Sequence, residues 1–517
     1  MSTTPRREFL KTVGRGMLVA GLGASLAHDL GLASARAADA PAPLSFGGYD
    51  GLIDLMQSTP PEKLQPILIE KLNKGEADLK QLISAGALAN AETFGGEDYV
   101  GFHTAMAMLP AWYMTDMLPS ERRPLPILKV LYRNSGQIQA FGGADKKVLR
   151  QQYAAEEATV ENVDLAIRDA GREGDVEKGE KLFAPLAKAP LKEMFNVLQP
   201  IMQDDINVHR FVFAYRTYGL ADLLGKEHAY TILRQCVHFS CEHEQGRIAR
   251  NQGGSPIREL MPKLLDQYKL AGKELGKRDP GDAAVEALAE TIYRGPADRS
   301  AEAVAGALAE GISPEVVGEA ISIASNLLCL RQGPDPWRTH GDSAGVHSSD
   351  ATNAWRNMAR IAEPRHAISG LIVAGYHVAV HTPYKGNAYP LAEHRAAIKA
   401  TDQEGLLAEA EDAIRHNDQG RAAAAIAIFG EKGGKPETVY ERMLKYTISE
   451  DGRLHGEKYF QTVQEEYKTT RPAFRWRQMI GLARVTASAY GYYDREDHYG
   501  RRAPGYEEAC RLLKVTA

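Results

Sequence analysis

The sequence of 517 residues has few cysteines and no marked excess of charge of either sign. Four cysteines in so long a chain are too few for a disulfide scaffold. Cys236 and Cys241 are five positions apart in a probable helix, so they point in different directions and make a poor disulfide pair. The formal net charge of −5 gives no reason to expect binding to nucleic acid.

The signature motifs of several enzyme classes are also missing. The chain has no P-loop, no G-x-G-x-x-G after a strand, no G-x-S-x-G elbow between a strand and a helix, no H-E-x-x-H and no C-x-x-C-H. These absences argue against nucleotide-dependent enzymes, Rossmann dehydrogenases, serine hydrolases, zincins and c-type cytochromes. Alternation of apolar and polar residues is almost absent, so we expect few strands.

The first 40 residues resemble a twin-arginine export signal. Thr4-Pro5-Arg6-Arg7 and the following Glu-Phe-Leu-Lys match its usual pattern, with Pro5 inserted before the arginines. An apolar run and small-residue cleavage sites follow, ending near Ala37. The resemblance implies a bacterial protein exported in the folded state by the twin-arginine translocase, to the periplasm or beyond. A disordered basic N-terminus is the alternative. No other stretch predicts insertion into a membrane.

The segment from His347 to His381 predicts two helices joined by a turn at Glu363-Pro364. From Ile368 onward the second helix carries no formal charge, and a helix that is apolar on every side is buried. It is too short to span a bilayer, so we expect it inside the protein core. His377 and His381 are four positions apart and therefore share one face, a spacing that suits two ligands of one metal ion.

The segment has a counterpart that begins at His209. In both segments a second histidine follows after 19 residues and a third after 34, which indicates an internal repeat. The second histidines are His228 and His366, and the third are His243 and His381. Weaker copies begin at His103 and His455 and lack the later histidines.

We therefore predict an all-α fold of four imperfect helical-hairpin repeats around a shared core, in a toroid or bundle. The signal would occupy residues 1–40 and the helical domain residues 41–517. The repeat units would cover about 45–150, 151–255, 256–395 and 396–517.

Hairpin geometry predicts where the histidines meet. The start of the first helix in an antiparallel hairpin lies beside the end of the second, so His209 should approach His243 and His347 should approach His381. If all four hairpins share one sense, their opening histidines gather at one end of the bundle. Neutral imidazole is the commonest metal ligand and suits Fe, Cu or Zn. The predicted metal ligands are His103, His209, His243, His347, His377 and His381. The alternative for each is a hydrogen-bonded core histidine.

The longest irregular segment, residues 332–346, runs directly into His347. Loops of this length in a compact helical protein are often functional. His340 and Asp342 are the predicted catalytic residues, as acid/base groups or as groups that orient the metal ligands. A plain surface excursion is the alternative interpretation.

The helical body resembles questin-oxidase-like proteins. The likeness lies in His209 and His347, each followed by Tyr or Trp a turn or two later. It implies an all-helical oxygenase and assigns no residue a role. Two functions follow from the sequence: an exported metal-dependent enzyme, an oxidoreductase acting on a small molecule, or a cofactor-free helical repeat protein that binds a partner and uses its histidines structurally.

Overall fold

The structure is a computed structural model. It describes residues 42–93, 99–149, 151–152, 162–333, 343–381, 383–450, 454–490 and 502–517. Within these ranges the chain is built from helices, which confirms the predicted all-α class. The strands found there are β1 (Ala42–Pro43) and β2 (Gln151–Gln152), which pair antiparallel with Ala42 opposite Gln152. The predicted export signal falls on residues outside the described ranges.

The helices from residue 45 onward form one compact unit and fall into four successive groups, each containing one helical hairpin. The first group comprises η1 (Gly47–Tyr49), α3 (Asp50–Ser58), α4 (Pro61–Lys74), α5 (Leu79–Thr93), the hairpin α6 (Tyr99–Thr115) and α7 (Pro124–Ala140), and η3 (Gly143–Asp145). The second comprises α8 (Val163–Glu173), α9 (Val176–Phe183), η4 (Ala184–Lys188), α10 (Leu191–Met202), and the hairpin α11 (Val208–Leu224) and α12 (Lys226–Ala249).

The third and fourth groups repeat this plan with more helices before the hairpin. The third comprises α13 (Ile257–Gln267), α14 (Asp282–Arg294), α15 (Ala297–Ala309), α16 (Pro314–Arg331), and the hairpin α18 (Ala344–Ile361) and α19 (Pro364–Ala379). The fourth comprises α20 (Ala392–Ala397), α21 (Gln403–Arg415), α22 (Gln419–Glu431), α23 (Pro436–Ser449), the hairpin α24 (His455–Thr469) and α25 (Trp476–Tyr490), and α26 (Tyr506–Leu513).

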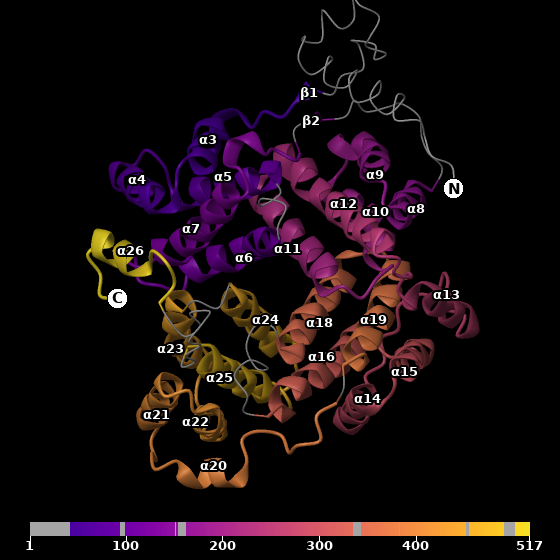
Figure 1. Cartoon of the computed structure of the whole chain (residues 1–517). Coiled ribbons are helices and arrows are strands. Elements are labelled where there is room, and N and C mark those ends of the chain that lie inside the picture. Colours follow the sequence, from indigo (N-terminus) through magenta and orange to yellow (C-terminus); the bar gives the residue numbers. More distant parts are fainter. Residues whose placement is uncertain are drawn as a thin grey trace, which may run out of the picture. The chain divides into compact units, whose positions relative to one another are not determined.

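The first helices of the four hairpins pack against one another in a closed cycle. Helix α6 contacts α11, α11 contacts α18, α18 contacts α24, and α24 returns to α6 (Figure 1). Each of them also packs on the second helix of its own hairpin. Because of this cycle, four helices that are widely separated in the sequence lie side by side. That the four hairpins are copies of one repeat stays a prediction.

The local signals in the sequence explain where the helices begin and end. Ser313 caps α16 through its hydroxyl group, which accepts a hydrogen bond from the backbone N–H of Glu315, and Pro314 occupies the first helical position. The turn predicted at Glu363-Pro364 separates α18 from α19. Helix α19 is buried on every side from His366 to Val378, as its lack of charge predicted.

Small residues let the helices of the third hairpin approach closely. A Cβ atom placed on Gly370 of α19 would lie 2.7 Å from the Trp355 ring of α18, and one on Gly375 would lie 2.6 Å from Val304 of α15. Glycine therefore makes room for a fully buried tryptophan at the first position and for close helix contact at the second.

The first helices of the four hairpins, α6, α11, α18 and α24, are called the inner helices below. A buried ion pair joins two of them, α18 and α24. The carboxylate of Glu466 in α24 accepts hydrogen bonds from Arg356 and Asn353 of α18 and from Ser322 of α16. The Arg356 and Glu466 side chains are almost completely excluded from solvent. Because a buried charge without a partner is costly, this pair fixes how α18 and α24 face each other.

All four cysteines are buried and unbonded to one another. Burial raises the pKa of the Cys236 thiol, and likewise that of Cys241, to about 12. The prediction that these two do not form a disulfide is confirmed.

Candidate metal centre

Four histidines, one from each inner helix, meet where these helices pack together. The Nε2 atoms of His103 and His209 are 3.0 Å apart. The imidazole centroids lie 4.7 Å apart for His103–His209, 5.7 Å for His209–His347, 5.4 Å for His347–His455 and 5.1 Å for His103–His455. The four rings, called the four-histidine cluster below, thus close a cycle of their own.

The positions of the histidines near the starts of their helices explain this convergence. His209 and His455 lie in the first turn of α11 and α24, and His347 lies in the first turn of α18, while His103 lies one turn inside α6. Equivalent positions on helices that pack in a cycle approach the same point. The structure therefore brings together the four helix-opening histidines of the predicted repeats.

Three of the four imidazoles are buried, and burial favours the neutral form of His209. His103, His209 and His455 are exposed by 8% or less. Burial lowers the pKa of His209 well below its usual value, and the neighbouring His347 adds to the effect. Because a neutral imidazole is the form that binds a metal ion, desolvation prepares His209 for ligation and removes a proton that would compete with the metal.

Hydrogen bonds orient two members of the cluster. His347 Nδ1 lies 3.1 Å from the Ser343 carbonyl oxygen, which can only accept, so the N–H is on Nδ1 and the lone pair of the neutral ring is on Nε2. Asn207 caps α11 by accepting a hydrogen bond from the backbone N–H of His209. Its side-chain nitrogen lies 2.8 Å from Nε2 of His243, which ties the end of α12 to the start of α11.

Aromatic side chains cover one side of the cluster. The Phe102 ring stacks on His103 at 5.3 Å between centroids and meets His209 at 5.5 Å and Phe239 at 4.8 Å. This apolar cover withholds water from the imidazoles and is a physical cause of the desolvation described above.

His377 and His381 form a second pair of imidazoles in the third hairpin. Their ring centroids are 5.4 Å apart, and the His377 ring also meets Phe211 of α11 edge-on. Burial lowers the pKa of His377 well below its usual value, with smaller effects from His381 and His347. Neither Nδ1 of His377 nor Nε2 of His381 has a hydrogen-bond partner in the part of the chain that the structure describes. His381 lies just beyond the end of α19.

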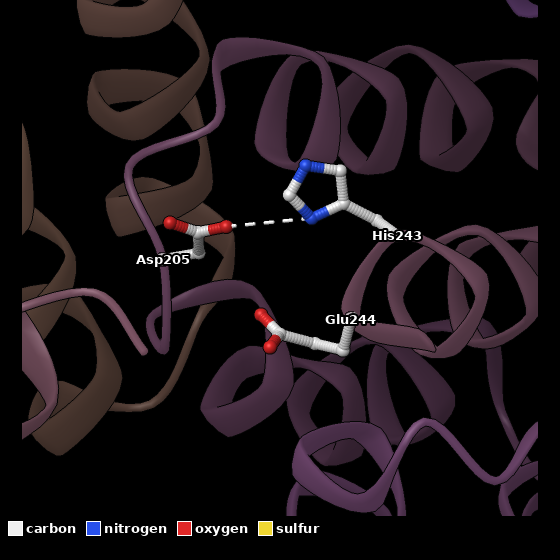
Figure 2. A group of neighbouring side chains, drawn as sticks. All are labelled: Asp205, His243 and Glu244. Carbon is white, nitrogen blue, oxygen red and sulfur yellow. Dashed lines mark ion pairs between the residues drawn. The ribbon is translucent and has the colours of Figure 1, made fainter. Parts of the chain in front are cut away.

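His243 belongs to a different arrangement, with Asp205 and Glu244 (Figure 2). One ligand atom from each of the three residues lies within 4.8 Å of the others, and Asp205 Oδ2 is 3.6 Å from His243 Nδ1. This geometry alone is compatible with a metal ion.

The charges around this triad argue against a cation there. Glu244 pairs with Arg210 at 3.2 Å and with Arg258, and Asp205 pairs with Arg247 at 3.3 Å. Burial by itself would raise the pKa of Asp205, but the arginines and a backbone N–H outweigh it and hold the pKa below its usual range. Guanidinium groups already occupy these carboxylates, so we interpret the triad as an ion-pair network that positions His243.

The predicted residues thus fall into three sets. The four-histidine cluster contains the predicted ligands His103, His209 and His347 together with His455, which the sequence placed at the same end but not among the ligands. The others, His243, His377 and His381, lie in the two neighbouring arrangements. The predicted catalytic residues His340 and Asp342 lie outside the described residues.

One residue that the sequence did not single out is Glu450, at the end of α23. It is 2% exposed and lies beside Lys129 and Glu457, which form a buried ion pair. A regular spacing in the chain could have drawn attention to it: a carboxylate precedes each of the four helix-opening histidines by five positions. These residues are Asp98, Asp204, Asp342 and Glu450.

No helix in the described ranges is both long enough and apolar enough to cross a membrane. Comparison of the chain with protein-family models, with curated proteins and with solved structures finds no match.

Proposed function

We propose that the four-histidine cluster binds one transition-metal ion and that this ion is the centre of an oxidoreductase acting on a small molecule. The observation that supports the proposal is the closed cycle of four imidazoles from four different helices, of which His103, His209 and His455 are buried. Metal–nitrogen bonds of about 2.0–2.1 Å place neighbouring ligand atoms roughly 3 Å apart. The separation of 3.0 Å between Nε2 of His103 and Nε2 of His209 fits this requirement.

The donor set restricts the metal. Imidazole suits Fe, Cu and Zn, whereas the hard cations Mg²⁺ and Ca²⁺ prefer oxygen ligands. A Zn²⁺ ion with four protein ligands is typical of a structural site. Fe or Cu would supply redox chemistry and can accept a further ligand, so we propose one of these two metals.

The remaining histidines support this centre in the proposal. His243 and Asn207 hold the start of α11, which carries His209. His377 is buried, and His347 contributes to the lowering of its pKa, so the two side chains interact electrostatically. We assign both a role in positioning the cluster, in place of the direct ligation predicted from sequence.

A cofactor-free protein with structural histidines is the second candidate. The 3.0 Å separation of the two Nε2 atoms also equals the length of a hydrogen bond, which one imidazole can donate and the other accept. Such a protein would bind a partner through its helical surface.

Metal analysis separates the two candidates. We expect near-stoichiometric Fe or Cu in the full chain isolated after export, and loss of the metal in His209→Gln. The matched control is His416→Gln, because the His416 side chain is exposed and contacts Asp412, which is not part of the cluster. A folded wild-type protein that contains no metal would overturn the enzyme proposal and favour the second candidate, and Zn would indicate a structural site.

Export by the twin-arginine route is part of the same proposal, because this route carries folded proteins and is commonly used by those that load a cofactor in the cytoplasm, although many cofactor-free proteins use it as well. It is supported by the Arg6-Arg7 pattern and the apolar run after it. Replacement of both arginines by lysine should leave the protein in the cytoplasm. Cell fractionation measures this, and unchanged export would contradict the assignment.

A further inference from the structure

Beside His455 the structure contains a small enclosed cavity. Its volume is about 20 Å³, enough for one water molecule. Apolar side chains from α18 and α25 form much of its wall, including Val346, Leu482, Val485 and Ala489. The polar residues that line it are Thr447, Glu450, His455, Tyr459 and Thr486.

Two of these polar groups are already engaged elsewhere. The hydroxyl of Thr447 donates to the carbonyl oxygen of Met443, and that of Tyr459 donates to the sulfur of Cys329. Glu450 differs from them. Neither of its carboxylate oxygens has a hydrogen-bond partner among the described residues, although the side chain is 2% exposed. Burying a carboxylate without hydrogen bonds is costly, so a group in the cavity must satisfy it.

The absence of a side chain at residue 456 makes room for this carboxylate. A Cβ atom on Gly456 would lie 2.6 Å from Oε1 of Glu450. The carboxylate therefore rests against the backbone at the start of α24, immediately after His455. Glu450 and His455 line the same cavity.

The charged groups around Glu450 come from two elements. Lys129 of α7 forms an ion pair with Glu457 of α24 and donates to the carbonyl oxygen of Thr447, while its ammonium group lies 4.0 Å from Glu450. Arg133, also on α7, acts at longer range. One buried lysine thus faces two carboxylates, and His455 lines the same cavity.

This balance of charge favours a bound proton. Burial raises the pKa of Glu450 to about 7, and repulsion by Glu457 works in the same direction against the attraction of Lys129. A carboxyl group with these surroundings can both take up and release a proton near neutral pH.

We propose that this cavity holds a water molecule between Glu450 and the four-histidine cluster, on the side of His455, and that Glu450 is the acid/base group for this water. In the step assigned to Glu450, one O–H bond of the water breaks and its electron pair stays on the water oxygen. The proton forms a new bond to a carboxylate oxygen of Glu450, and hydroxide remains in the cavity beside the cluster. The inference rests on the proposed metal site.

The experiment uses the full chain loaded with Co²⁺, whose visible spectrum responds to a change in its ligands. We expect a spectral change between about pH 6 and pH 9 as the water ionises, as for water at a metal site. Its midpoint should shift by about one pH unit or more in Glu450→Gln. Gly456→Ala should shift it as well, because the added Cβ displaces the carboxylate without removing it. This second variant keeps the test valid if Glu450→Gln fails to fold.

Two matched controls distinguish a local effect from a general one. Glu411→Gln changes another buried glutamate that has basic partners, Arg442 and Lys445, and that does not line the cavity. Gly51→Ala adds a methyl group to a helix where nothing lies within 4 Å. Both should titrate as the wild-type does.

Cobalt content, measured in every variant, separates the two proposals. Identical titrations in all variants with full cobalt content would overturn the role of Glu450 and leave the metal site intact. Failure of the wild-type protein to bind cobalt would overturn the metal site and this inference with it. A crystal structure of the loaded protein gives a direct check: a water within about 3 Å of the Glu450 carboxylate is expected, and a cavity filled by side chains would contradict the proposal.

Discussion

His103 and His209 are 106 positions apart in the chain, yet their Nε2 atoms lie 3.0 Å from each other. The contact joins α6 to α11, two inner helices that belong to different hairpins. His347 and His455 complete the cluster from α18 and α24, so the site exists only when all four inner helices are in place. Stability of the helical unit and formation of the candidate site are therefore linked.

Acidification should weaken the folded protein before its carboxylates titrate. Burial lowers the pKa values of His209 and His377, and lowers that of His366 to about 4. A histidine with a lowered pKa binds fewer protons folded than unfolded, so its contribution is complete above about pH 6.5 and is lost as pH falls below that value. In the pH range between its unfolded and its folded pKa, each such group lowers the free energy of unfolding by about 1.4 kcal/mol for every pH unit of acidification.

Two carboxyl groups oppose this trend. Burial raises the pKa of Asp350 and of Glu450, so both favour the folded state as the pH falls. The histidines with lowered pKa values outnumber them, and they are His209, His228, His243, His366, His377 and His381. Urea unfolding of the metal-free protein at pH 7.5, 6 and 5 should show a falling midpoint. His366→Gln should reduce the slope, whereas a slope equal to that of the wild-type would contradict the assignment.

The ion pair between Arg356 and Glu466 should be far more important than a surface pair. Glu466→Ala would leave the buried Arg356 without its carboxylate and remove the hydrogen bonds to Asn353 and Ser322. We expect the free energy of unfolding to fall by about 3–5 kcal/mol. The control Glu259→Ala removes an exposed pair with Lys263 and should have little effect in the same denaturant titration. Equal losses in the two variants would show that burial is not the cause.

The sequence predicted the meeting of histidines for a physical reason that the structure makes clear. Helices of similar length in successive hairpins return equivalent positions to the same end of a bundle, so the histidines that open the four segments, His103, His209, His347 and His455, come together. The partners of His243 were beyond such reasoning, because Asp205, Arg210 and Arg258 come from a loop and two helices whose relative rotation no local pattern specifies.

The burial of Glu450 was likewise hidden from the sequence. It depends on the contacts of α7 with α23 and α24, and α7 lies far from both of these helices in the chain. A glutamate at the end of a helix is usually solvated. Only the approach of Lys129 and the missing side chain at Gly456 show that this one is enclosed.

Close contact at Gly370 predicts a position that tolerates no added atom. In Gly370→Ala the new Cβ would lie 2.7 Å from the ring of Trp355, which is fully buried and cannot move without disturbing its neighbours. Overpacking of this kind costs about 1–3 kcal/mol and outweighs the gain in helix propensity, about 1 kcal/mol. Gly51→Ala adds the same atom where nothing lies nearby and should stabilise the protein slightly. Thermal unfolding compares the two, and a stabilised Gly370→Ala variant would contradict the packing described here.

Metal binding should raise the thermal stability of the protein, since the four-histidine cluster forms only in the folded state. A ligand present at 100 times its dissociation constant stabilises the folded state by about 2.7 kcal/mol. We therefore expect the Tm of the metal-free wild-type protein to rise on addition of Fe²⁺ or Cu²⁺. His103→Gln and His455→Gln should each abolish most of the rise, because either change opens the cycle. His394→Gln is the control, since His394 lies on α20 and contacts Tyr389. A rise that persists in both cluster variants would place the bound metal elsewhere, and the Asp205, His243 and Glu244 triad would then be the first site to test with His243→Gln.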